Sequence, residues 1–134
     1  MFEALDIGAS GLLAQRVRLD TIAANVANIN TTHNARGERV PYRRRFATFM
    51  PGRAEDPAQP GVHVDAVQQD TSPFQKRYEP GHPDADAEGY VRYPNVDLAF
   101  EMVNMMEASR AYEANANLME VSKAMFNASL RLIA

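Results

Sequence analysis

The sequence predicts an α+β protein in which two long helices flank a small, irregular, β-rich middle. All eight prolines lie between Pro41 and Pro94, and proline breaks helices. Both flanking segments space their apolar residues by three and four, the heptad pattern of helices that pack lengthwise on other helices. The chain therefore divides into an N-terminal helix at 1–31, a Pro-rich β/loop region at 32–94 and a C-terminal helix at 95–134.

The first helix is expected over residues 2 to 30. Gln15 and Arg16 interrupt its seam once, and Gly8 and Gly11 each cost about 1 kcal/mol relative to Ala. The small glycines also let a neighbouring helix approach closely. The seam consists of Leu5, Ala9, Leu12, Leu19, Ile22, Val26 and Ile29. Asn and Thr residues end the segment and favour caps and turns.

In the middle region, 42–49 and 61–67 alternate apolar with polar residues and read as short strands. A mobile loop is expected at 51–60 between them, and 90–93 forms a last short strand. About 65 residues give only a marginal independent core. This region therefore needs the helices or neighbouring chains for its stability.

The last helix is the dominant element. Asn95 or Asp97 can cap its first turn, Glu101 lies near the positive end of its dipole and Arg131 near the negative end. At 1.5 Å per residue it would reach roughly 55 Å. Its heptad seam is Ala111, Ala114, Leu118, Val121, Met125, Ala128 and Leu132.

Apolar side chains also lie off this seam, on other sides of the last helix. Five of the seven methionines fall in this helix: Met102, Met105, Met106, Met119 and Met125. Phe100, Val103, Phe126, Leu130 and Ile133 lie off the seam as well. Ordinary core filling is the simplest reading of a methionine stripe. A helix that is apolar on several sides is more typical of one surrounded by several neighbours, so other copies or other proteins must cover part of it.

No pattern for catalysis or cofactor binding stands out. The chain lacks cysteine, which excludes disulfides and thiolate chemistry, and it shows neither a phosphate-binding loop nor a nucleophile elbow. His33, His63 and His82 lack metal-ligand spacing. We therefore predict no enzyme activity, no catalytic residue, no cofactor and no metal.

The acidic segment 84–89 has acids at alternate positions and Gly sixth, like the start of a calcium loop. The twelfth position, which needs a bidentate Glu, is Asn95, and Pro83 and Pro94 stand where an EF-hand has helices. A solvated acidic turn is the favoured interpretation.

A basic run with interleaved aromatics raises the question of nucleic acid. The run is Arg36, Arg39, Arg43, Arg44 and Arg45, with Tyr42 and Phe46 between them. It is short, and the chain carries a net charge of −3, so we predict no nucleic-acid binding. The two favoured alternatives are a solvated strand face and a contact with an acidic neighbouring subunit.

Nothing in the sequence predicts membrane insertion, because no apolar run approaches the roughly 20 residues that span a bilayer. The N-terminus holds two acids and no basic segment, unlike a cleavable secretory signal. The expected chain stays in the cytosol or leaves it by a route that reads no such signal.

Several motifs resemble those of bacterial flagellar rod and hook proteins. The N-terminal signature is Ala-Asn-Val-Ala-Asn-Ile-Asn-Thr at 24–31, and the C-terminal signature lies at 101–103 and 108–115. The segments 41–44, 70–73, 78–86, 89–91 and 94–97 resemble one member of that family, which belongs to the proximal rod. The turn at 32–40 looks longer than usual, and the loop at 51–60 has no counterpart.

The resemblance implies that the terminal helices pair as an antiparallel coiled coil and form one assembly unit. It implies a structural subunit of the proximal rod of the flagellar basal body, polymerising with other rod proteins and copies of itself into a hollow drive shaft. It also implies passage through the flagellar type III export apparatus to the periplasm without a cleaved signal peptide. Another axial rod protein of the same family and a cytosolic helical-hairpin dimerisation module remain as alternatives.

Polar groups at seam positions can specify the register of packed helices. An alternative is that the Asn residues only cap the first helix and that Arg110 is solvated. The predicted subunit-interface residues are Leu12, Leu19, Ile22, Asn25, Val26, Asn28, Thr31, Met102, Met106, Arg110, Tyr112, Asn115, Leu118, Val121 and Met125. We expect folding of the free chain to be incomplete until these surfaces are covered.

Overall fold

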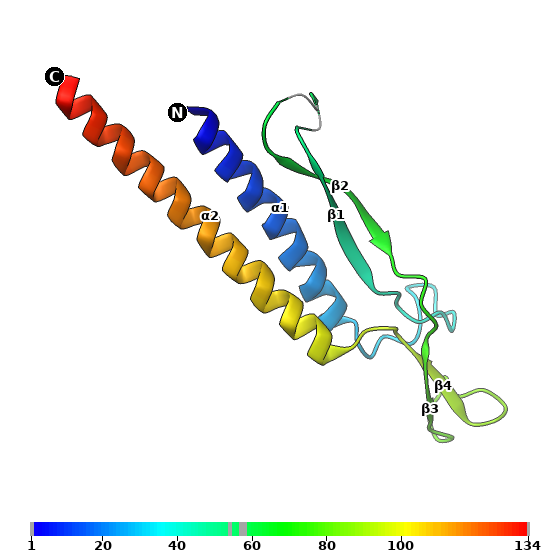
Figure 1. Ribbon diagram of the computed structural model, residues 1–134. Coiled ribbons are helices and arrows are strands. Elements are labelled where there is room, and N and C mark those ends of the chain that lie inside the picture. The colour runs from blue at the N-terminus through cyan, green and yellow to red at the C-terminus, as the bar shows by residue number, and fades with distance from the viewer. Residues whose placement is uncertain (1, 54, 57–58, 134) are drawn as a thin grey trace.

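The computed structural model describes residues 2–53, 55–56 and 59–133. Its elements in chain order are α1 (Phe2–Ala27), β1 (Arg45–Pro51), β2 (Val62–Gln69), β3 (Gln75–Tyr78), β4 (Tyr90–Tyr93) and α2 (Leu98–Ile133) (Figure 1). The predicted α+β class with two long terminal helices is confirmed. Part of the predicted mobile loop at 51–60 lies outside the described residues, as do the two terminal residues of the predicted helices.

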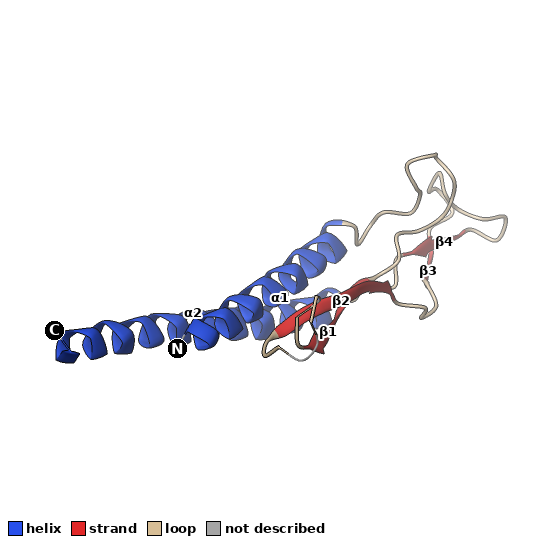
Figure 2. Ribbon diagram, turned by 90° about the horizontal axis from the view of Figure 1, so that it is seen from above, coloured by secondary structure: helices blue, strands red, loops and turns tan. Residues whose placement is uncertain are grey.

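The two helices pack side by side and run in opposite directions (Figures 1 and 2). Gly8 lies against Met119 and Gly11 against Asn115. Further along, Arg18 is 3.4 Å from Glu107. A Cβ atom added at Gly8 would lie 2.7 Å from the Met119 Cγ. The predicted antiparallel pairing, with close approach at the glycines, is thus confirmed.

The face of α2 that contacts α1 is not the heptad seam read from the sequence. Ala108 and Glu101 are fully buried, whereas the seam residues Leu118, Val121 and Met125 are 53%, 59% and 63% exposed. Met119 and Asn115 of α2 pack against the two glycines of α1. With these residues facing α1, most of the heptad seam of α2 faces away from it.

The β1–β2 ribbon covers a second side of α1, which lies between it and α2 (Figure 1). The ribbon is antiparallel, with Arg45 opposite Gln69 and a register shift between Thr48 and Phe49. On the helix, the Ser10 hydroxyl accepts a hydrogen bond from the Val62 N–H at 3.1 Å.

The first strand begins at residue 45 rather than 42, because the Arg44 N–H donates to the Asn95 side chain at 2.8 Å. Strand β3, which the sequence did not reveal, pairs with β4 from Gln75 opposite Tyr93 to Tyr78 opposite Tyr90. This second ribbon lies at the end of the molecule away from the two chain termini (Figure 1).

Hydrogen bonds at the start of α2 identify the residue that caps this helix. The Asp97 carboxylate accepts the Phe100 N–H at 3.1 Å, as one of the two predicted caps. The other candidate, Asn95, instead donates to the carbonyls of Asp70 and Ser72, both at 3.1 Å. At its other end α2 extends past the beginning of α1 (Figures 1 and 2). Among the described helices, neither is long and apolar enough to cross a membrane.

Candidate assembly interface

A buried polar group ties the two helices to the first strand. Glu101 is fully buried one turn into α2, and its carboxylate accepts a hydrogen bond from the Arg44 Nε at 2.5 Å. Its second oxygen accepts from the Asn25 amide at 3.1 Å. The charge of this carboxylate is therefore paired inside the chain.

The Asn25 side chain also forms hydrogen bonds with the backbone of strand β1. Its amide nitrogen donates to the Arg45 carbonyl at 2.7 Å, and its oxygen accepts the Arg45 N–H at 2.9 Å. The Tyr42 hydroxyl donates to the same oxygen at 3.1 Å. Burial raises the pKa of Tyr42. We call Asn25, Tyr42, Arg44, Arg45 and Glu101 the Glu101 cluster.

Two arginines of the basic run, Arg43 and Arg44, make contacts within the chain. The Arg44 side chain is 15% exposed and also pairs with Asp70 at 3.4 Å. Arg43 donates to the carbonyls of Asp70 and Ser72 at 2.9 and 3.1 Å and lies 4.3 Å from the Phe74 ring centre. Neither predicted alternative, a solvated face or a contact with an acidic neighbour, describes Arg43 and Arg44. Their partners are distant in sequence, so spacing could not reveal them.

Asp70, the residue after β2, contacts both arginines: its carbonyl accepts from Arg43 and its carboxylate pairs with Arg44. We call these three residues the Asp70 clamp. Hydrogen bonds from Ser72, and to a lesser degree the Arg44 guanidinium, lower the pKa of the Asp70 carboxyl. The charged form is therefore the one that the folded chain stabilises.

The acidic segment 84–89 is a hydrogen-bonded turn. Asp86 accepts the N–H groups of Glu88 and Tyr90 at 3.0 and 2.8 Å. Asp84 accepts from the Thr32 hydroxyl, which lowers the pKa of Asp84, and lies 3.4 Å from His33. Within the part of the chain that the structure describes, no three His, Cys, Asp or Glu residues are placed to hold a metal ion.

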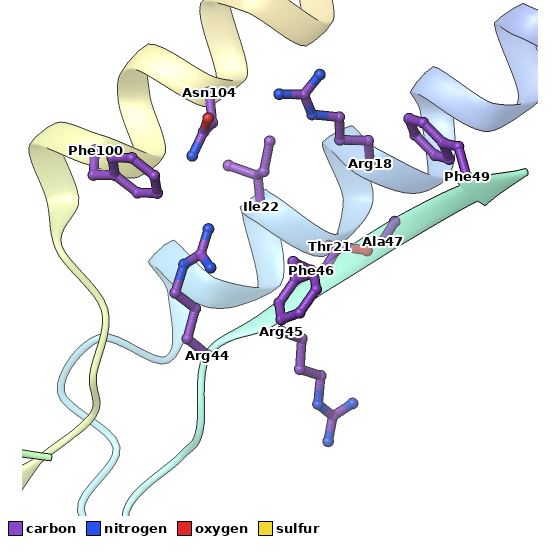
Figure 3. A pocket seen from close by; sticks show the side chains of 10 residues that line it. All are labelled: Arg18, Thr21, Ile22, Arg44, Arg45, Phe46, Ala47, Phe49, Phe100 and Asn104. Atoms are coloured by element: carbon purple, nitrogen blue, oxygen red, sulfur yellow. The ribbon is translucent and has the colours of Figure 1, made fainter. Parts of the chain in front are cut away.

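An open groove of about 360 Å³ lies where α1, β1 and the start of α2 meet (Figure 3). Phe46 and Phe49 line it from the strand, Ile22 from α1 and Phe100 from α2. Its polar lining is completed by Arg18, Thr21, Arg44, Arg45 and Asn104. The three phenylalanines and Ile22 give the groove an apolar wall, and the arginines form its polar rim.

A row of exposed, largely apolar residues runs along α2, mostly on the side away from α1. Its members, spaced mostly by three and four, are Met102, Val103, Met106, Arg110, Ala114, Leu118, Val121, Met125 and Leu132. We call this set the outer stripe. Met106 is 55% exposed and Leu132 89%. Exposed apolar surface of this extent is typical of interaction sites.

The predicted interface residues fall into separate environments. Met102, Met106, Arg110, Leu118, Val121 and Met125 belong to the outer stripe, and Tyr112 is exposed beside the α1 contact. Leu12, Leu19 and Val26 are half-buried on α1. For these the interface assignment stays a prediction.

The five other predicted residues, Ile22, Asn25, Asn28, Thr31 and Asn115, make contacts inside the chain. Ile22 and Asn25 are buried within the chain, and their place at a contact between subunits stays a prediction. Asn115 packs on Gly11. Asn28 accepts from the Thr31 hydroxyl at 3.1 Å and donates to the Ala24 carbonyl, which is the capping role that the sequence left as an alternative.

Comparison with known proteins agrees with this architecture. Residues 5–36 match the family described as flagella basal body rod protein, and residues 87–132 match the C-terminal family of the flagellar basal body rod FlgEFG proteins.

Full-length relatives are more specific. The flagellar basal-body rod protein FlgC of Borreliella burgdorferi is 39% identical over 99% of this chain and 97% of its own length. The proteins of the same name from Bacillus subtilis and Salmonella typhimurium are 40% and 42% identical, over 98% and 95% of this chain and 97% and 93% of theirs. The chain belongs to the FlgC family of flagellar basal-body rod proteins.

Proposed function

We propose that this structural rod subunit belongs to the proximal rod, where it polymerises with other rod proteins and with copies of itself into a hollow drive shaft. The observation that carries the proposal is the outer stripe, a regular apolar seam that the chain leaves uncovered. A rod subunit needs such a seam, because a helix must bury its apolar side against something. The chain has no catalytic task in this proposal.

The direct test is genetic. In a strain that lacks the chain, we expect no swimming and no rod beyond the export gate, and we expect wild-type chain to restore both. A density map of the restored basal body should place the chain between the export gate and the distal rod. Normal swimming in the deletion strain would contradict the proposal, and a cytosolic dimer found by light scattering would favour a helical-hairpin module instead.

We further propose that assembly completes folding. The buried Glu101 carboxylate has its charge and hydrogen bonds satisfied within the chain, whereas the last turns of α2 extend past α1 without its support (Figure 1). In the free chain, little offsets the ordering entropy of those turns. Docking would bury the outer stripe and stabilise them by about 25 cal/mol per Å² of apolar surface.

Far-UV circular dichroism and hydrogen exchange on the dilute chain test this coupling. The helix content should fall below that of the assembled chain, with slow exchange near Glu101 and fast exchange beyond Leu118. A fully helical chain with uniform protection and one cooperative melt would contradict it.

The proposed location is the periplasmic rod, reached through the flagellar type III export apparatus without removal of a signal peptide. A chain that is incompletely folded before assembly suits passage through a narrow export channel. Mass spectrometry of the chain from isolated basal bodies should find its N-terminal segment intact.

A further inference from the structure

A surface on α1 complements the outer stripe of α2. It consists of Leu13, Arg16, Asp20, Ala23, Ala24 and Ala27, all exposed and mostly spaced by three and four along the helix. We call it the α1 face. It points away from Gly8 and Gly11, which contact α2, and from Ser10, which contacts β2.

The α1 face carries charges that complement Arg110 of the outer stripe and Glu113, which lies beside the stripe, in a matching order. Arg16 and Asp20 follow one another on α1, and Arg110 and Glu113 on α2. All four are exposed, and none forms an ion pair with another described residue. The helices α1 and α2 are antiparallel. If a second copy lies parallel to the first, its α1 therefore places Asp20 next to Arg110 and Arg16 next to Glu113 of the first copy.

The register of the two helices fixes the offset that this match requires. Within one chain Gly11 lies opposite Asn115 and Arg18 opposite Glu107, so Arg110 is level with the region of Arg16. Bringing Asp20 to Arg110 shifts the second copy along the helix by three to four residues, an axial step of about 5 Å.

Side-chain sizes also match in that register. The small residues Ala23, Ala24 and Ala27 come opposite the large side chains of Met102, Val103 and Met106. Leu13, which is 65% exposed, comes opposite Ala114 and Leu118. Large side chains set against small ones allow two helices to interdigitate.

We propose that the α1 face of one copy docks on the outer stripe of the next, with Asp20 paired to Arg110 and Arg16 to Glu113. This inference rests on the proposed function and names the partner of the outer stripe as a second copy of this chain. Since the two surfaces differ, the contact is heterologous and leaves one surface free at each end. The copies therefore form an open row rather than a closed dimer.

Cysteine cross-linking tests the contact, and the chain itself gives no background disulfides because it has no cysteine. Chains with Asp20→Cys and Arg110→Cys, oxidised in isolated basal bodies, should give a ladder of multimers. Chains carrying one change each, produced together, should give dimers only. The matched control joins Asp20→Cys with Lys123→Cys, at an exposed position of α2 off the outer stripe, and should give no ladder. Products that stop at dimers in the double variant would overturn the open row.

Charge exchange provides an independent test in living cells. Asp20→Arg and Arg110→Asp should each abolish swimming, and the two together should restore it. Asp20→Arg with Lys123→Asp has the same net charge and should not swim. If wild-type chain restores swimming but the ladder and the charge rescue are both absent, the contact is wrong while the rod role stands. If wild-type chain does not restore swimming, the proposed function itself fails.

Discussion

The two ends of α2 show opposite ways of handling polar and apolar groups. At its start, a fully buried carboxylate is paired with Arg44 and Asn25, and every partner comes from the same chain. Towards its end, Val121 and Met125 leave more than half of their surface in solvent. The Glu101 side of the first end is satisfied within the chain, whereas the second end leaves a large apolar surface in solvent. The difference separates residues that set the shape of the subunit from residues available to other subunits.

The largest expected effect comes from placing a charge in the outer stripe. Val121→Asp should abolish swimming, because an unpaired carboxylate would be buried at the contact. The free chain should keep its circular dichroism, since Val121 contacts solvent there. Asn127→Asp, at an exposed position of the same helix off the outer stripe, is the control and should swim. Loss of helix content in the Val121 variant would mean that this end is not a free surface.

Breaking the Glu101 cluster should have the opposite signature, a loss of stability in the isolated chain. Glu101→Gln leaves the Arg44 guanidinium without its buried counter-charge, which should lower the free energy of unfolding by about 3 kcal/mol. Urea unfolding followed by tyrosine fluorescence measures this. Glu113→Gln, the same change at an exposed position, should stay within about 0.5 kcal/mol of wild type. Equal effects at both sites would refute the distinction between the two ends.

A smaller effect is expected where the helices touch. In Gly11→Ala the new Cβ would lie 2.8 Å from the Asn115 side-chain nitrogen, so we expect a loss of roughly 1 kcal/mol despite the better helix propensity. Combining it with Asn115→Ala removes the clash and should recover that loss. Thermal melts of the single and double variants check the coupling, and additive effects would argue against this close approach.

The smallest effect is a pH dependence at the Asp70 clamp. The folded pKa of Asp70 lies below its unfolded value, so its contribution is present above the unfolded pKa, near 3.9. It is lost as the pH falls through that value towards the folded pKa. Asp70→Asn should flatten this acid limb, because it lowers the free energy of unfolding at neutral pH and leaves it almost unchanged below the folded pKa. An unchanged acid limb would show that the clamp does not discriminate between the two forms of the carboxyl.

The sequence alone determined the order of the elements, the two helices and the glycine contact, because proline position, heptad spacing and side-chain size are local properties. It also pointed to the outward residues of α2, although the seam was read without knowing which face it occupied. Only the tertiary structure decided that face, and with it the burial of Asn25 and Ile22. It also revealed the pairing of Arg44 with Glu101 and the strand at 75–78. These depend on groups that lie far apart in the chain, and the rotation of α2 follows from the close approach at Gly8 and Gly11 and the buried hydrogen bond between Asn25 and Glu101. Periodicity identifies an apolar side of a helix, but the partner that covers it is set by long-range contacts that no local pattern encodes.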